Sequence, residues 1–137
     1  MATPTKTLRL RPKLRTEIER IAKRTRRSFA EVTQDLLEEA LRMRQCPGIY
    51  FADESLGREA KVAGTGLGVW EVIRDYQAFK GNERTLARTL PHLGAAGLKS
   101  ALLYYRRYAD EIDDAIADNA LPFEVLDARY PGLMRRE

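Results

Sequence analysis

Polar and apolar residues alternate over residues 5–11, near the start of the chain. Leu8 and Leu10 fall on one face of an extended segment, which is the two-residue period of a strand with one solvated side. The opposite face is polar and holds Thr5, Thr7 and Arg9. The pattern predicts a short basic strand. The plain alternative is an edge strand that its charges keep soluble.

Two amphipathic helical patterns follow, separated by the basic turn Arg24–Arg27. Pro12 suits the first turn of the first helix, where its missing N–H is not needed. The apolar face of that helix is Leu14, Ile18, Ile21 and Ala22. The second helix opens with a capping box in which Ser28 is the N-cap and Glu31 the third residue. Its apolar face is Phe29, Val32, Leu36, Leu37, Ala40 and Leu41.

A strand and two helices in about forty residues are too little chain to bury a core alone. We therefore expect a homodimer in which a second copy supplies the missing half. Two paired strands fit the DNA major groove, so the polar strand face would meet base edges. The start of the second helix would hold a phosphate. The predicted DNA-binding residues are Thr5, Thr7, Arg9, Arg26, Arg27 and Ser28.

Residues 5–44 resemble the ribbon-helix-helix repressors of the Arc/MetJ/CopG type. The matching positions are Leu8-Arg9-Leu10, Leu14, Ile18, Ile21-Ala22, Arg27-Ser28 and Leu36-Leu37. The resemblance implies a two-stranded ribbon in the major groove of operator DNA. It departs at Arg11 and Pro12, which shift the common proline by one position, and at Arg26, which stands where the turn usually has glycine.

The charge distribution agrees with a nucleic-acid-binding first part. Residues 1–45 carry 12 Lys and Arg against 6 Asp and Glu, whereas residues 46–137 carry 12 against 14. Cys46 is the only cysteine, which excludes a disulfide framework and favours a reducing compartment. No apolar run has the length of a membrane span or the form of a signal peptide. We expect a cytoplasmic protein with no membrane partner.

Pro47 and Gly48 end the second helix and predict a domain boundary. Short strands are predicted at 49–51 and 60–63, and helices at 69–80 and 82–90, the latter with Asn82 as N-cap. Leu98, Leu102, Tyr105, Ile112 and Ile116 predict one further helix of about six turns that ends near Asn119. The predicted fold is mainly α. Its parts are a ribbon-helix-helix dimerisation unit (1–45), a small helical domain with a short β segment (46–119) and an extended tail (120–137).

Residues 49–110 resemble a small family long catalogued as a domain of unknown function, with a helix-turn-helix-like core, and often described as a VapB-type antitoxin. The matching segments are Val62–Trp70, Leu90-Pro91-His92-Leu93 and Ala101–Tyr105. Gly66 and Gly68 replace the more usual Arg and Pro. The resemblance implies neutralisation of a cognate toxin, for which a PIN-type ribonuclease is favoured, and autoregulation.

Catalytic and ligand-binding alternatives are weaker. The glycines at 64, 66 and 68 are compatible with a phosphate-binding loop. The sequence lacks the Lys-Ser/Thr of a P-loop and the full dinucleotide-binding fingerprint, so we favour a tight strand-to-helix turn. Cys46 and His92 are too few for a zinc site, and His92 is expected to bond nearby backbone. The acidic residues at 110–118 are expected to form a mainly solvated helix face. We expect no enzyme activity, no cofactor and no metal.

The second part is predicted to have its own core around Trp70, Ile73, Leu90, Leu102 and Tyr105. Three tyrosines at 104, 105 and 108 exceed what one core face needs, so one of them is expected to face a partner, with dimers joining into tetramers. The tail is rich in large apolar groups, which indicates either that it folds back on its own domain or that it is a toxin-binding arm. The predicted arm residues are Phe123, Leu126, Tyr130, Arg135 and Arg136.

The favoured function is therefore a type II antitoxin that binds operator DNA as a dimer, represses its own operon and neutralises a toxin. The alternative is a stand-alone ribbon-helix-helix transcriptional regulator whose C-terminal domain oligomerises or senses a ligand. A small enzyme is the weakest of the three readings, because no catalytic constellation is visible in the sequence.

Overall fold

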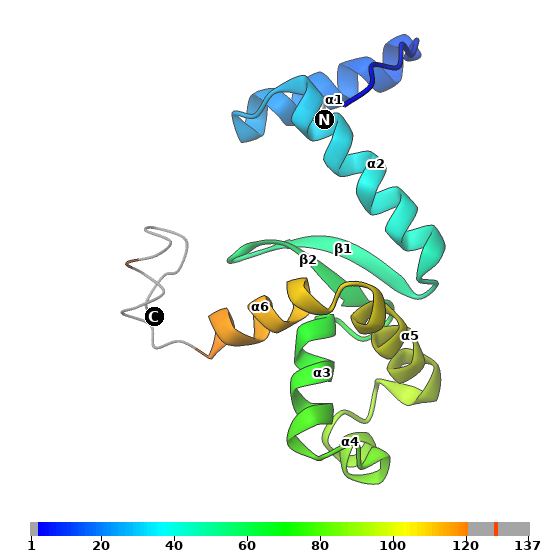
Figure 1. The fold of residues 1–137 in the computed structure, drawn as a ribbon, viewed down its shortest axis with the longest axis vertical. Helices are drawn as coiled ribbons and strands as arrows, with labels where there is room; N and C mark the ends of the chain where they lie inside the picture. Colours follow the sequence, from blue (N-terminus) through cyan, green and yellow to red (C-terminus); the bar gives the residue numbers. More distant parts are fainter. Residues whose placement is uncertain (1–2, 121–127, 129–137) are drawn as a thin grey trace. The chain divides into compact units, whose positions relative to one another are not determined.

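The computed structural model describes residues 3–120 and Ala128. In this part the chain is mainly helical with one antiparallel hairpin, which confirms the predicted fold class at that level. The elements are α1 (Pro12–Thr25), α2 (Phe29–Gln45), β1 (Ile49–Glu54), β2 (Gly57–Val62), α3 (Val69–Ala78), α4 (Glu83–Thr89), α5 (Gly94–Arg107) and α6 (Ala109–Asn119) (Figure 1). The chain divides into two compact units, residues 1–41 and 42–137, so that α2 runs from one into the other.

Residues 3–11 have no regular secondary structure in the single chain. A ribbon strand is defined by hydrogen bonds to a partner strand, and one chain holds no such partner for this segment. Arg11, at the end of the segment, has the extended backbone angles φ −59° and ψ 140°. The strand therefore stays a prediction that depends on dimerisation.

The turn between α1 and α2 follows a Schellman pattern. The Arg27 amide donates to the carbonyl of Ala22 at 3.0 Å, and the Arg26 amide donates to Lys23 at 3.4 Å. Arg26 itself is left-handed at φ 55°, a conformation that costs a residue with a side chain roughly 1–2 kcal/mol. The turn thus takes the glycine-type geometry even though arginine occupies the position.

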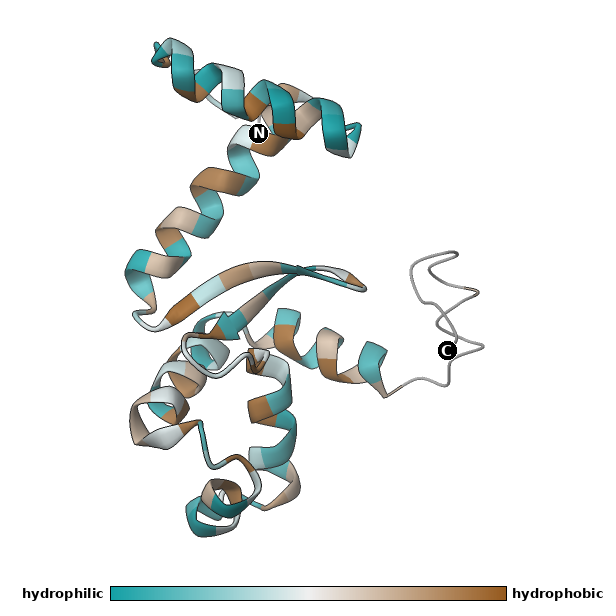
Figure 2. Ribbon diagram, turned by 180° about the vertical axis from the view of Figure 1, so that it is seen from behind, coloured by the Kyte–Doolittle hydropathy of each residue, from teal (hydrophilic) through white to brown (hydrophobic). Residues whose placement is uncertain are grey.

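The first unit has a small core. Its fully buried residues are Ile18, Ala22 and Val32, with Leu10, Ile21 and Phe29 packed against them. Figure 2 shows further apolar positions along α2, on turns beyond the crossing with α1. The helices begin and end where the sequence predicted, but they bury only part of their apolar faces within one chain.

The second unit is built on the hairpin and helices α3, α5 and α6. The strands pair from Ile49 opposite Val62 to Glu54 opposite Gly57, which extends both predicted strands toward the tip. The hairpin lies at one end of α3, with α5 and α6 packed against that helix (Figure 1). One continuous core of thirteen buried residues joins these elements.

The glycine-rich segment forms a tight turn between β2 and α3, as the sequence predicts. Gly64 and Gly66 have φ +78° and +70°. Gly68 has an ordinary φ, but an added Cβ would lie 2.8 Å from Glu59 Oε2 and 2.9 Å from Trp70 Cδ1. The Gly68 amide donates to Glu71 Oε1 at 3.2 Å. The backbone amide at the start of α3 is therefore already bonded to the Glu71 side chain.

The prediction of one six-turn helix up to Asn119 is wrong, because the helix breaks at Tyr108. This residue has φ −130° and ψ 46° and ends α5, while α6 starts at Ala109. The break turns α6 so that Ile112 enters the core and the Tyr108 ring lies 4.8 Å from the Tyr104 ring. No Pro or Gly marks this break in the sequence, so the apolar period alone could not reveal it.

The predicted core of the second unit is partly right. Ile73 is buried, whereas Trp70, Leu90, Leu102 and Tyr105 are only partly buried at the edge of the core. The tyrosine at the centre is Tyr104, with 0% exposure. On α5 the buried face is therefore that of Leu98, Ala101 and Tyr104 rather than that of Leu102 and Tyr105.

Candidate nucleic-acid interface

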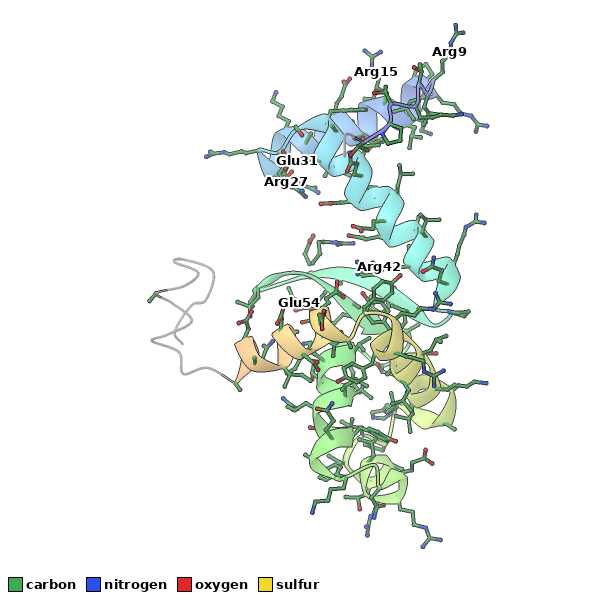
Figure 3. The ribbon with its side chains drawn as sticks, viewed as in Figure 1. Arg9, Arg15, Arg27, Glu31, Arg42 and Glu54 are labelled. Carbon is green, nitrogen blue, oxygen red and sulfur yellow. The ribbon has the colours of Figure 1, made fainter. Side chains whose placement is uncertain are left out.

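The predicted base-reading residues lie in the segment before α1. Thr5, Thr7 and Arg9 are all exposed, and Figure 3 shows the Arg9 side chain extending away from the ribbon. Leu8, on the other face of this segment, is 68% exposed, while Leu10 packs on the small core. An exposed leucine beside a polar face is the arrangement that a second strand and a second core half would complete.

The exposed large apolar side chains of the described residues all lie between Leu8 and Met43. On the helices of the first unit, Leu14 is 51% exposed, Leu37 54% and Leu41 58%. These residues belong to the apolar faces predicted for α1 and α2, so their exposure is not random surface composition. Half of the apolar face of this unit is uncovered in the single chain.

The predicted phosphate-binding residues meet at the start of α2, but they differ in their availability. Arg27 pairs with Asp35 and lies 3.5 Å from a carboxylate oxygen of Glu31 (Figure 3). The hydrogen bond to Asp35 raises the pKa of Arg27. Arg26 is exposed and has no ion pair within the described residues. A phosphate could thus pair with Arg26 directly, whereas Arg27 would first have to break its ion pairs with Asp35 and Glu31.

Ser28 acts as the N-cap of α2. Its Oγ accepts a hydrogen bond from the Glu31 amide at 3.1 Å and donates one to Glu31 Oε1 at 3.1 Å. The amide half of the predicted capping box is therefore present, while the glutamate side chain meets the serine hydroxyl. Because that hydroxyl is engaged on both sides, phosphate binding at this end would use backbone amides rather than Ser28 Oγ.

Sequence reasoning missed a polar cluster where α2 enters the second unit. The Arg42 guanidinium donates to Tyr104 Oη at 2.9 Å and to Glu111 Oε1 at 2.6 Å, and it stacks 4.1 Å from the Tyr108 ring centre. Tyr104 in turn donates to Glu111, and Tyr108 donates to Gln45 at 2.8 Å. In the sequence, Arg42 is only one charged residue near the end of an amphipathic helix, so the sequence does not predict this cluster.

Opposing effects set the pKa values in the cluster. Burial lowers the pKa of Arg42, but the bonds to Glu111 and Tyr104 outweigh it and raise the pKa overall. Burial and the nearby Glu111 carboxylate raise the pKa of Tyr104. The arginine therefore stays charged and the tyrosine stays neutral at physiological pH, and the cluster acts as a fixed structural contact.

The three tyrosines of this region have partners within the unit. Tyr105 Oη donates to Asp113 at 2.8 Å and accepts from Gln77 at 3.2 Å, and the hydroxyls of Tyr104 and Tyr108 are bonded as described. Their number therefore does not require a second protein surface. Tetramer formation through one of them stays a prediction.

The residues considered for other chemistry are not gathered into a site. Cys46 is fully buried, which raises the pKa of its thiol, while His92 is exposed and makes no bond with described residues, contrary to the expected backbone contact. In the described part of the chain, no group of three or more His, Cys, Asp or Glu could hold a metal ion. Likewise, none of its helices has the length and apolar character that a membrane span requires.

The predicted toxin-binding residues Phe123, Leu126, Tyr130, Arg135 and Arg136 lie outside the described residues.

Comparison with family models, curated proteins and solved structures finds no match to this chain.

Proposed function

We propose that the chain is a dimeric DNA-binding repressor of the ribbon-helix-helix type that serves as the antitoxin of a toxin–antitoxin pair. The observation that carries the DNA-binding half is the uncovered apolar face of the first unit beside an exposed polar segment. A core of three buried residues cannot stabilise a domain by itself. A second copy would bury the exposed leucines and, in the same step, pair the two segments.

The chemistry of the paired segment fits base reading. Arginine makes bidentate contacts to guanine, and threonine bonds base edges or contacts the thymine methyl. The surrounding surface supplies the nonspecific attraction, because residues 1–45 carry twice as many basic as acidic residues. Arg26 and the start of α2 support the proposal as a phosphate contact that positions the ribbon.

Selection from a pool of random duplexes tests the DNA-binding half with the full chain. A ribbon-helix-helix dimer should enrich one short motif, and it should bind the enriched duplex about 10³-fold or more tightly than random duplex at the same salt concentration. Enrichment of no motif, with equal affinity for all duplexes, would leave only nonspecific charge attraction and would overturn the proposal.

The antitoxin half rests on the sequence resemblance of residues 49–110 and on the composition of the tail. Its test is co-expression with the small protein encoded in the adjacent reading frame. Growth should stop when that protein is expressed alone and recover when the full chain is present. A chain that binds its motif but does not restore growth would instead be a stand-alone regulator, the second function that the sequence left open.

A further inference from the structure

An apolar groove lies between α4 and α5 and continues along α5. Figure 1 shows where these two helices lie. It consists of two adjoining hollows of about 320 and 360 Å³ that share Glu83, Ala95 and Leu98. The first hollow is floored by Leu86, Leu90 and Leu93, and the second continues along α5 past Leu102 and Leu103. A groove of this composition favours an apolar occupant.

The rim of the groove is basic. Arg84 borders the first hollow, and Lys99 and Arg106 border the second. All three side chains are exposed, and within residues 3–120 none of them has an ion pair. Glu83 is the one acidic residue among those that line either hollow. An occupant with carboxylates beside its apolar groups would match both the floor and the rim.

The described surface of the second unit holds no such occupant, and the exposed leucines of the first unit are those that the proposed dimer covers. In residues 42–120, Met43 is the single large apolar side chain that is exposed, so this unit of a second copy has no apolar ridge to insert. Duplex DNA does not fit either, because its charged backbone would lie against a floor of leucines. The matching chemistry is found in the sequence after α6.

Residues 121–127 read Leu-Pro-Phe-Glu-Val-Leu-Asp. They combine four large apolar side chains with the carboxylates of Glu124 and Asp127, and the next cation is Arg129. We propose that the α4–α5 groove binds residues 121–127 of this chain, supplied by the same molecule or by a second copy. Phe123 and Leu126 occupy the leucine-lined floor, and the two carboxylates meet the basic rim.

This inference does not depend on the antitoxin proposal. Where both hold, they have a joint consequence: Phe123 and Leu126 cannot bind the groove and a toxin at the same time. The groove then covers the toxin-binding anchors until a partner displaces them, so the measured affinity for the toxin includes the free energy of releasing the segment.

A matched pair of variants separates the groove from general surface effects. Ala95 lines both hollows, and its neighbour Ala96 lines neither, although both are exposed on α5. Ala95→Glu places a carboxylate on the apolar surface of the groove, whereas Ala96→Glu adds the same charge to the same helix outside it. Neither residue belongs to the buried core, so both variants should fold.

The test uses the full chain with Phe123→p-benzoylphenylalanine, which cross-links to nearby residues on irradiation. The cross-links should map by mass spectrometry to residues 83–106. Their yield should fall about tenfold in Ala95→Glu and change less than about twofold in Ala96→Glu. The mass of the cross-linked product distinguishes binding within one molecule from binding between two copies.

Three results would overturn the proposal: cross-links to the hairpin and α6 instead, no cross-links at all, or equal yields in the two variants. Far-ultraviolet circular dichroism checks that each variant is folded. If Ala95→Glu is unfolded, Ala87→Glu is used in its place, because Ala87 is also exposed and lines the first hollow.

Discussion

The guanidinium of Arg42, on α2, donates to the buried hydroxyl of Tyr104, on α5, across a distance of 2.9 Å and a separation of 62 residues in the chain. Tyr104 has no exposed surface, and its hydroxyl also donates to Glu111 on α6. One phenol thus joins the last turn of α2 to α5 and α6, the helices on either side of the break at Tyr108. Such a bridge stabilises the second unit where three helices meet.

Replacement of Tyr104 by Phe should therefore destabilise the chain. The change removes one hydroxyl and leaves Arg42 paired with Glu111, so we expect a loss of about 1–2 kcal/mol in the free energy of unfolding. Urea unfolding followed by circular dichroism measures it. Tyr105→Phe is the matched control, because that hydroxyl bonds at the surface, and its removal should cost less than about 0.5 kcal/mol. Equal losses of unfolding free energy in the two variants would contradict the assignment of Tyr104 Oη as a stabilising bridge between the helices.

Glu59 makes stability depend on pH. Burial is the largest effect on this carboxyl and raises its pKa; the Trp70 hydrogen bond and Lys61 lower the pKa, Glu54 and Glu71 raise it, and the net change is upward. An acid with a raised pKa binds a proton more readily when folded, so the folded state loses stability as pH rises above the ordinary pKa of 4.5. The loss is complete once pH exceeds the raised value.

Glu59→Gln tests this dependence. Glutamine still offers an oxygen to Trp70 Nε1, which donates at 2.7 Å in the parent, but it carries no charge to desolvate. We expect the variant to gain stability relative to the parent at neutral pH, and the gain to vanish below pH 4.5. Urea unfolding at the two pH values measures the difference, with the exposed Glu83→Gln as a control. A variant that is less stable than the parent at neutral pH would contradict the account.

Leu37 tests the dimer directly. It is 54% exposed in the single chain, and a second copy is proposed to cover it, so Leu37→Glu would bury a charge in the interface. We expect this variant to run as a monomer by light scattering at concentrations where the parent is a dimer, since an unpaired buried charge costs several kcal/mol. Gln34→Glu adds the same charge at an exposed polar position of α2 and should stay dimeric. A monomeric parent would contradict the prediction at once.

The sequence predicted those elements whose signals are local. Asn82 was recognised as a cap and accepts the Thr85 amide at 3.1 Å, and Pro12 stands at the start of α1. The apolar runs predicted two short strands but not their pairing as a hairpin, and both strands are longer than predicted. In these cases a single side chain or a short apolar period determines the local backbone conformation, so the sequence alone predicts the element.

The break at Tyr108 and the Arg42 cluster could not be predicted, because both depend on contacts far apart in the chain. The apolar period continues across Tyr108, and the change of direction appears only in the fold, where Ile112 and Tyr104 belong to one core. For the candidate interface, the residue types were predicted, but the pairing of Arg27 with Asp35 was not. The two residues of this ion pair are eight positions apart, one in the turn and one in α2, and no sequence pattern marks such a pair.

The base-reading role of Arg9 is the central claim, and it has one direct measurement. The affinity of the full chain for its selected duplex and for random duplex is compared, by fluorescence anisotropy at fixed salt, between the parent and Arg9→Ala. Arg15→Ala is the control, because this exposed arginine of α1 pairs with Glu19. We predict that Arg9→Ala loses about 1–3 kcal/mol at the selected duplex and relaxes its preference at one base position, while Arg15→Ala keeps that preference. An Arg9→Ala variant that binds the selected duplex as tightly and as selectively as the parent would contradict the assignment of this segment as a DNA-reading ribbon.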